Sequence, residues 1–152
     1  MERLVIPSPV GRLGLAGQNG LLTGIVFDET RETTSEAAYL YKAAEELNEY
    51  FEGKRQSFDI PCLLSGPPFF MKCLKALITV PYGTLISYGE LAGLAGSPRA
   101  ARAVGNAVHN NPLPILIPCH RVIAGDGSIG GFGGGLDKKR ILLAIEGVRR
   151  YE

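Results

Sequence analysis

The run Ser65-Gly66-Pro67-Pro68 constrains the fold more than any other feature of the sequence, because paired prolines interrupt both helices and sheets. Before this run, short apolar stretches alternate with turn residues, whereas after it apolar residues recur at helical spacing. The chain has 152 residues, enough for two small domains. We therefore expect an α+β protein, with a sheet-and-helix domain over residues 1–65 and a mostly α domain over residues 66–152.

Three strands are expected in the first domain, over residues 4–6, 13–16 and 22–27. Asn19-Gly20 lies between the second and third strands and is a strong signal for a two-residue hairpin. A further short strand is expected over residues 58–60. No catalytic group of residues stands out in this small α/β-type sheet, so we interpret it as a scaffold.

One helix is expected to cover this sheet. Thr33 and Glu36 have the spacing of a capping box, which predicts the start of the helix there. The helix is expected to end near Gly53. One of its faces would be apolar, made by Ala37, Leu40, Ala44, Leu47 and Phe51.

The second domain begins with two predicted helices. The first is indicated by an apolar stripe and ends before Pro81; the stripe consists of Phe70, Leu74, Leu77 and Ile78. Ser87 and Glu90 form a second possible capping box, which predicts a short helix to about residue 94. A tight turn at Ala95-Gly96 follows.

Ser97 is expected to cap the next helix, with Pro98 at the first helical position, where its missing N–H costs nothing. Two short helices joined by a glycine-containing turn, the second with Arg99 and Arg102, are typical of a helix-turn-helix. A hairpin over residues 122–131 would form a wing beside it. Asp137 is expected to cap a last helix over residues 138–146, which Gly147 ends.

Charge is distributed unevenly along the chain. Residues 1–66 hold ten acidic and six basic residues, a net of −4, whereas residues 67–152 hold five acidic and ten basic residues, a net of +5. A polyanionic partner for the second domain is the simplest interpretation. No apolar run is long enough to span a bilayer and no signal peptide is recognised, so we expect a cytoplasmic protein, or a nuclear one in a eukaryote.

The cysteines and histidines favour reduced thiols without a metal. The three cysteines (Cys62, Cys73 and Cys119) are too few for a disulfide scaffold, and the two histidines (His109 and His120) accompany no Cys-x-x-Cys pair. We expect no metal site and no cofactor. Cys73 is interpreted as a core residue, and His109, near a helix C-terminus, as structural.

The segment Pro118-Cys119-His120-Arg121-Val122 follows an apolar run and contains the most reactive residue pair. A thiolate is a strong nucleophile, and a neighbouring base can generate it. By itself the pair is a weak signal, because buried cysteines are common and inert. The surrounding motifs therefore have to decide between a nucleophile and a packed core residue.

Read in order, those motifs resemble one family. They are Ser87-Tyr88-Gly89-Glu90-Leu91-Ala92, Ala100-Ala101-Arg102-Ala103-Val104-Gly105, Asn111-Pro112, the Pro-Cys-His-Arg-Val run, Gly130-Gly131-Phe132 and Leu143-Ala144-Ile145-Glu146-Gly147. This ordered set resembles the O6-alkylguanine-DNA alkyltransferases over about residues 67–148. The resemblance implies a winged helix-turn-helix domain that repairs DNA directly, by one irreversible alkyl transfer from guanine O6 to a cysteine; O4-alkylthymine is a further candidate substrate.

The resemblance also implies roles for individual residues. Cys119 is the nucleophile, His120 acts as its base through a bridging water, and Glu146 orients His120. Tyr88 donates its phenol proton toward N3 of the departing guanine. The thioether that forms has no hydrolysable bond, so the protein is consumed in a single turnover.

DNA recognition is implied for the second helix of the helix-turn-helix. Arg102 resembles the arginine that fills the place of a base flipped out through the minor groove. The other residues in the predicted DNA-binding set are Ser97, Arg99, Ala101 and Gly105. Asn111 resembles the hinge between this helix and the reactive loop, and the alkyl pocket would be lined by Pro114, Val122, Phe132 and Gly133. Many relatives have tyrosine and often serine at the last two positions, which leaves alkyl-size preference open.

Two alternatives are also compatible with the sequence. One is a damage-binding protein without transfer activity, although such alkyltransferase-like proteins have another residue in place of Cys119. The other is a winged-helix regulator with an inert buried cysteine. Under the favoured hypothesis the protein is a monomer that acts on double-stranded DNA containing alkylated guanine.

Overall fold

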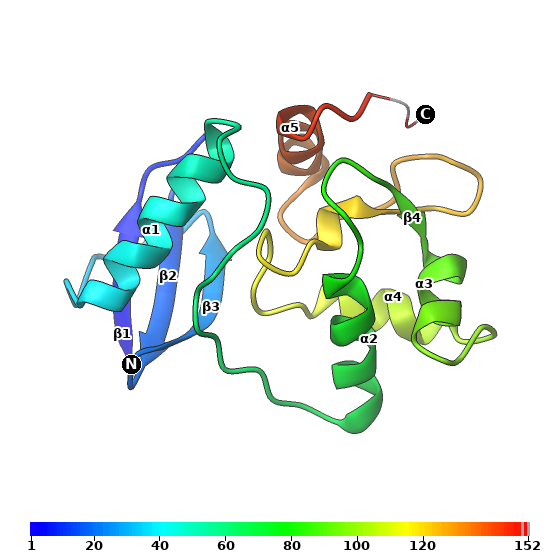
Figure 1. The fold of residues 1–152 in the computed structure, drawn as a ribbon, viewed down its shortest axis with the longest axis horizontal. Coiled ribbons are helices and arrows are strands. Elements are labelled where there is room, and N and C mark those ends of the chain that lie inside the picture. Colours follow the sequence, from blue (N-terminus) through cyan, green and yellow to red (C-terminus); the bar gives the residue numbers. More distant parts are fainter. Residues whose placement is uncertain (150, 152) are drawn as a thin grey trace. The chain divides into compact units, whose positions relative to one another are not determined.

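The computed structural model describes residues 1–149 and 151, which form two compact units, Met1–Leu64 and Ser65–Glu152. Unit 1 contains a three-stranded sheet and one helix, whereas unit 2 is mostly helical with a pair of two-residue strands (Figure 1). The expected mixed α+β fold class is therefore confirmed. No helix in the described part of the chain is both long enough and apolar enough to span a bilayer.

The sheet of unit 1 is antiparallel in the order β1-β2-β3, with β1 over Glu2–Ile6, β2 over Leu13–Gln18 and β3 over Leu21–Phe27. Asn19 and Gly20 connect β2 to β3 with φ angles of 54° and 78°. Positive φ at both central residues is what a tight hairpin turn requires. The three predicted strands and the hairpin are therefore confirmed.

Helix α1, Ala38–Phe51, covers one face of the sheet (Figure 1) and fully buries Leu40 and Leu47. It begins five residues after Thr33, so the predicted Thr33–Glu36 capping box is wrong. The Thr33 hydroxyl instead accepts a hydrogen bond from the backbone N–H of Val5 at 3.0 Å, on the edge strand β1. The Thr33 hydroxyl, which was expected to cap the helix, is therefore bonded to the edge strand of the sheet.

The expected strand over residues 58–60 is also wrong. The N–H of Asp59 donates to Oε1 of Glu46 on α1 at 2.8 Å, so it is not available to a neighbouring strand. The chain pairs with β3 slightly later, through an isolated bridge between Leu22 and Cys62. Backbone bonds from Leu22 N–H to Pro61 and from Leu63 N–H to Leu22 make this contact.

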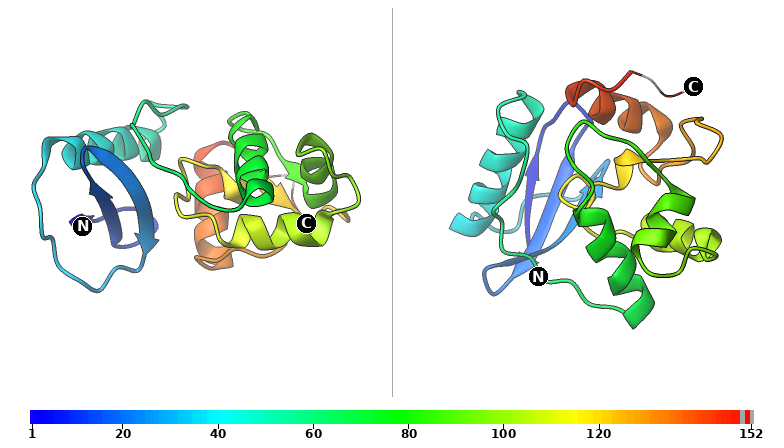
Figure 2. Two further views of the ribbon diagram at one scale, coloured as in Figure 1. Left: turned by 90° about the horizontal axis from the view of Figure 1, so that it is seen from below. Right: turned by 45° about the vertical axis from the view of Figure 1, so that its right-hand side comes forward.

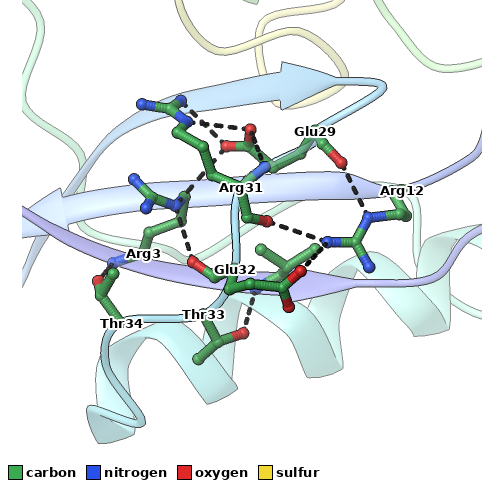
Figure 3. Close-up of polar contacts among 8 residues, drawn as sticks. Arg3, Arg12, Glu29, Arg31, Glu32, Thr33 and Thr34 are labelled. Carbon is green, nitrogen blue, oxygen red and sulfur yellow. Dashed lines mark hydrogen bonds and ion pairs between the residues drawn. The ribbon is translucent and has the colours of Figure 1, made fainter.

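A cluster of charged groups gathers around Glu29 at the end of β3. Figure 3 shows Arg31 and Arg3 converging on the Glu29 carboxylate, with Oε1 of Glu29 3.0 Å from Nη2 of Arg31 and 3.8 Å from Nε of Arg3. Arg12 donates to the Glu29 carbonyl oxygen at 2.8 Å. A Cβ at Gly14 would lie 2.5 Å from the same carboxylate. Any larger residue at position 14 would therefore clash with the buried side chain of Glu29.

Unit 2 begins with α2, Pro68–Ile78, and α3, Tyr88–Leu94. The capping box of α3 is confirmed, since the Ser87 hydroxyl and the Glu90 carboxylate each accept the other residue's N–H at 3.0 Å. Helix α2 fully buries Cys73, as predicted, but leaves Ile78 50% exposed at its last turn. Ile78 therefore lies outside the buried stripe to which it was assigned.

Helix α4 spans Ala101–His109 and starts three residues later than expected. The Ser97 carbonyl accepts the N–H of Ala100 at 2.9 Å, so Ser97-Pro98-Arg99-Ala100 form a turn. Ser97 is not a helix cap and Pro98 is not in the first helical turn. Proline fits the second position of such a turn as well as it fits the start of a helix, which explains the error.

The predicted wing hairpin is wrong in its pairing. Strand β5, Val122–Ile123, pairs in parallel with β4, Ile86–Ser87, and the described residues 128–131 form no strand. Two backbone bonds close the turn that follows β5, from the Ala124 N–H to the Ser128 carbonyl at 3.1 Å and from the Gly127 N–H to the Ala124 carbonyl at 3.0 Å. Because β4 supplies the partner of β5, a hairpin is not needed to pair it.

Helix α5, Leu136–Ile145, completes the unit. Its N-cap is Gly135, and Asp137 lies in the first turn with an exposed side chain, so the predicted Asp137 cap is wrong. Gly147 follows the helix with φ of 79°, which confirms the predicted end. In Figures 1 and 2 the short 3₁₀ helix η1, Cys119–Arg121, lies between α5 and α4.

Candidate active site

The loop between α4 and η1 is held by the side chain of Asn111. Its Nδ2 donates to the carbonyl of Ile117 at 2.8 Å, and its Oδ1 accepts the N–H of Leu113 at 3.0 Å. Within this loop Ile115 is buried and has a φ of 77°, a conformation that β-branched residues rarely adopt. One amide side chain thus ties together both ends of a strained, buried loop that leads to Cys119.

Cys119 is the first residue of η1 and is only 6% exposed. Burial raises the pKa of its thiol to about 11, although a hydrogen bond with Asn111 and the charge of Lys139 act in the opposite direction. The thiol is therefore protonated at neutral pH. Reaction as a thiolate requires a base that removes this proton on demand.

The next residue is a histidine coupled to a carboxylate. His120 and Glu146 both have fully buried side chains, and Nε2 of His120 lies 2.6 Å from Oε2 of Glu146. Burial lowers the pKa of His120, against the opposing effect of Glu146, so its imidazole is neutral at neutral pH. With Nε2–H donated to Glu146, Nδ1 is the acceptor nitrogen. The pair can therefore take up a proton and stabilise the imidazolium that results.

Glu146 is kept ionised by several donors. Arg121 contributes two bonds, from Nε at 2.8 Å and from Nη2 at 3.0 Å, and the N–H of Gly83 contributes a third at 2.9 Å. Burial alone would raise the pKa of Glu146, but the bonds from His120 and Arg121 outweigh it and lower that pKa. Arg121 is anchored by a further bond to the Val80 carbonyl at 2.7 Å.

Arg121 was not among the residues assigned to the site. It was visible in the Pro-Cys-His-Arg-Val run, but a sequence pattern does not tell whether an arginine points to solvent or to a buried acid.

Tyr88, at the start of α3, is half-buried, and two glycines, Gly105 and Gly130, face its ring. A Cβ at Gly105 would lie 3.9 Å from the Tyr88 ring, and one at Gly130 would lie 3.7 Å from it. Burial raises the pKa of Tyr88, and the charge of Cys119 raises it further. Tyr88 therefore keeps its proton at neutral pH and lies within electrostatic reach of the reactive sulfur.

The predicted DNA-binding residues all lie in α4 or in the turn before it. Arg99 and Arg102 are exposed, whereas Ser97, Ala101 and Gly105 are partly buried. Helices α3 and α4 pack against each other, as a helix-turn-helix requires. Gly105 also faces the Tyr88 ring, which a Cβ at this position would meet at an ordinary contact distance of 3.9 Å.

The four predicted pocket residues are distributed over three segments. Val122 is fully buried in β5, Pro114 is buried in the Asn111 loop, Phe132 is half-buried and Gly133 is exposed. Phe132 and Gly133 belong to the glycine-rich segment, defined here as residues 129–135.

Lys139 is the residue that the sequence analysis missed most clearly. It is fully buried in α5, and its Nζ donates to the carbonyl oxygens of Val122, Ile129 and Gly131 at 2.6, 2.6 and 3.0 Å. Burial lowers its pKa to about 8, while the charge of Cys119 opposes this shift. Its spacing of three and four residues from the buried Leu142 and Leu143 was the available signal.

A metal has no evident binding group here. Among the described residues, no group of three or more His, Cys, Asp or Glu side chains could hold a metal ion. The described residues around Cys119 supply one thiol, one imidazole, one phenol and several buried charged groups.

Comparison with known proteins follows the two units. The family model described as 6-O-methylguanine DNA methyltransferase, DNA binding domain, matches residues 68–148, and the ribonuclease-like domain of the same family matches residues 2–64. A methylated-DNA–protein-cysteine methyltransferase of Mycobacterium bovis is 44% identical over 147 residues, covering 93% of this chain and 89% of that protein. One from Methanosarcina barkeri is 40% identical, covering 93% and 94%.

Solved structures agree with these matches. Mycobacterium tuberculosis OGT in complex with DNA superimposes with a TM-score of 0.90 at 43% identity, covering 96% of this chain and 92% of that chain. Schizosaccharomyces pombe Atl1, in complex with damaged DNA containing O6-carboxymethylguanine, has a TM-score of 0.50 at 33% identity. That match covers 57% of this chain and 82% of that one.

Proposed function

The chain belongs to the 6-O-methylguanine DNA methyltransferase family, and from that membership we propose that Cys119 is the residue that accepts the alkyl group. Its relatives are enzymes of direct DNA repair that transfer a methyl group from DNA to a protein cysteine, and this chain is an enzyme of the same kind.

The observation that carries the proposal is the His120–Glu146 pair next to Cys119. A thiol with a pKa of about 11 needs a base, and the neutral imidazole of His120 lies one residue away, with Glu146 bonded at 2.6 Å to hold its tautomer. Cys73 is buried in α2 and Cys62 belongs to unit 1; burial raises the pKa of both thiols. Neither is followed by a histidine.

The transfer proceeds in one displacement. The Cys119 proton passes through a bridging water to Nδ1 of His120, and the thiolate attacks the alkyl carbon while the carbon–O6 bond breaks. The electron pair of that bond stays with guanine, which takes the phenol proton of Tyr88 at N3. The Tyr88 phenolate later recovers a proton from the imidazolium through solvent. The thioether on Cys119 is permanent, so each protein molecule reacts once.

The proposed partner is double-stranded DNA that contains O6-alkylguanine. An atom inside the base stack is out of reach, so the base has to be flipped out, at a cost of a few kcal/mol. Arg102, exposed on α4, is proposed to enter the minor groove and occupy the vacated place, with Asn111 tying the helix to the reactive loop. We propose action as a monomer, in the cytoplasm or, in a eukaryote, in the nucleus.

Damage binding without transfer is the second candidate function. It is suggested by the similarity of part of the chain to S. pombe Atl1. Transfer is favoured instead, because Cys119 is followed by the base His120, and His120 is bonded to the orienting carboxylate of Glu146.

Intact-mass measurement distinguishes the two. After mixing with duplex DNA that contains O6-methylguanine, the protein is expected to gain the mass of one methyl group, and Cys119→Ser is expected to gain none. Cys62→Ser is the matched control, since it removes a thiol from unit 1 and is expected to react normally. DNA binding with unchanged mass, or methylation that persists in Cys119→Ser, contradicts the proposal.

A further inference from the structure

The glycine-rich segment meets both helices of the helix-turn-helix at positions where it has no side chain. A Cβ at Gly130 would lie 3.7 Å from the ring of Tyr88, at the start of α3. A Cβ at Gly131 would lie 3.4 Å from Cε1 and 3.7 Å from Nε2 of His109, the last residue of α4. The segment expected to line the alkyl pocket therefore touches α3 at one glycine and α4 at the next.

His109 approaches this segment with its backbone as well as with its ring. A Cβ at Gly133 would lie 3.9 Å from the carbonyl oxygen of His109. The φ angle of Gly131 lies outside the left-handed region, so its backbone conformation does not by itself require glycine. The neighbour that a side chain at Gly131 would meet is the imidazole of His109, which therefore limits where this part of the segment can lie.

The same helix face carries His109 and the arginine proposed to enter DNA. Arg102 and His109 are seven residues apart in α4, which is about two turns, so their side chains project from one face of the helix. Both residues are exposed. The face proposed to contact DNA thus ends at the residue that touches the glycine-rich segment.

We infer that His109 is a specificity-determining residue, whose imidazole holds Gly131 in place and thereby limits the size of the alkyl group that the pocket accepts. This inference rests on the proposed function and on the assignment of Phe132 to the pocket. Gly131 directly precedes Phe132, so a shift of its backbone displaces the half-buried phenyl ring. His109 acts through Gly131 and is a positioning residue.

Two groups restrain Gly131 from different directions. Its carbonyl oxygen accepts a hydrogen bond from Nζ of Lys139 at 3.0 Å, which fixes one atom of the peptide. The imidazole of His109 lies against the α-carbon instead. Without that ring, Gly131 can move toward α4 while keeping its hydrogen bond, and the pocket becomes wider.

The test compares His109→Ala with Asn106→Ala, a matched control that removes an exposed polar side chain from the same face of α4. Single-turnover transfer is measured from two duplexes of one sequence, which contain O6-methylguanine or O6-benzylguanine. The benzyl-to-methyl ratio of the two rates is the readout. Because both rates come from one preparation and one duplex sequence, general losses of DNA affinity or folded fraction affect them alike.

His109→Ala is expected to raise this ratio at least about threefold. The effect is expected to stay below the roughly 10–200-fold that one methylene makes inside a pocket, because His109 acts through Gly131. His109→Phe, which keeps a ring without the imidazole nitrogens, and Asn106→Ala are both expected to keep the wild-type ratio.

An unchanged or lower ratio in His109→Ala overturns the inference, as does an equal rise in Asn106→Ala. A role of His109 in DNA binding alone would slow transfer from both duplexes equally and leave the rate with free O6-benzylguanine unchanged. That result also overturns the inference.

A double-mutant cycle checks the contact itself. Gly131→Ala adds a methyl group against the imidazole, so its effect on the ratio is expected to fall by at least about half when His109 is alanine. Equal effects of Gly131→Ala with and without the imidazole would show that the two residues act independently, which contradicts the inference.

The two proposals fail in different ways. If the wild-type protein gains no alkyl mass, the proposed function of Cys119 is lost and this inference with it. If wild type is alkylated on Cys119 while His109→Ala keeps the wild-type ratio, only the role of His109 is lost.

Discussion

Both units bury a glutamate beside arginine, yet the two clusters are built differently. In unit 1, Glu29 is paired with Arg31, whose side chain is 58% exposed. In unit 2, Glu146 is paired with His120 and Arg121, whose side chains are 0% and 7% exposed. Arg31 therefore keeps much of its contact with water, whereas the partners of Glu146 do not. The first cluster fastens a loop to a sheet, whereas the second holds charge next to a reactive thiol.

Removal of the base His120 is the strongest test of this difference between the two clusters. His120→Ala is expected to slow transfer about 10²–10⁴-fold, the usual contribution of a positioned general base, while DNA affinity stays close to wild type. Single-turnover transfer and DNA binding are measured on the same preparation. A normal rate in His120→Ala would exclude His120 from the mechanism and reduce the His120–Glu146 pair to packing.

Glu146→Gln is expected to cost about 3–5 kcal/mol of unfolding free energy, because it leaves the buried side chains of His120 and Arg121 without their anion. Denaturant unfolding measures this loss. A cost below about 1 kcal/mol, the range of exposed ion pairs, would show that the cluster in unit 2 behaves like a surface one.

Acid titration checks the same residue. The pKa of Glu146 is lowered in the folded protein, so the stability that its charge contributes is complete above the unfolded carboxyl pKa, about 4.3, and is lost as the pH falls toward the folded value. Wild type is therefore expected to lose stability on acidification below about pH 4–5. Glu146→Gln is expected to have a flatter profile there, and an equally steep one would contradict the assignment.

Alkylation itself probes how tightly unit 2 is packed around Cys119. Cys119 is only 6% exposed, so an alkyl group added to its sulfur is expected to overpack the site and destabilise the protein by about 1–3 kcal/mol. Melting temperatures before and after complete reaction with O6-methylguanine DNA measure this. No change after full alkylation would indicate free space beside the sulfur.

Glu29→Gln is expected to have the smallest effect. It is expected to lower the melting temperature less than Glu146→Gln does, because Arg31 can return its charge to water. Transfer from the free modified base is expected to stay at the wild-type rate. A slowed transfer at equal folded fraction would give unit 1 a part in the chemistry that nothing in its sequence indicates.

Signals within four residues of each other predicted local structure well in some places and failed in others. Asn19-Gly20 and the Ser87–Glu90 box succeeded because the groups that they satisfy are neighbours in the chain. Thr33 failed because an edge strand some 28 residues earlier uses its hydroxyl. A capping residue specifies what it can bond, and the rest of the fold decides which bond it makes.

Longer-range pairings were beyond the sequence. The partner of β5 is β4, 36 residues earlier at Ile86↔Val122, so the local turn at residues 124–128 suggested a hairpin that does not form. Lys139 stands between two other basic residues and resembles part of a solvated face. Its burial depends on three carbonyl groups that only the folded loop brings together.

The order of residues along the chain determined the division into two units, most of the helices and strands, and the candidate nucleophile with its histidine, because these depend on turn residues, periodicity and adjacent side chains. Tertiary structure decided which buried groups carry charge. Glu146 meets His120 and Arg121 across 26 and 25 residues, and whether an acid there is solvated or enclosed depends on desolvation, which belongs to the packed fold and not to any segment of it.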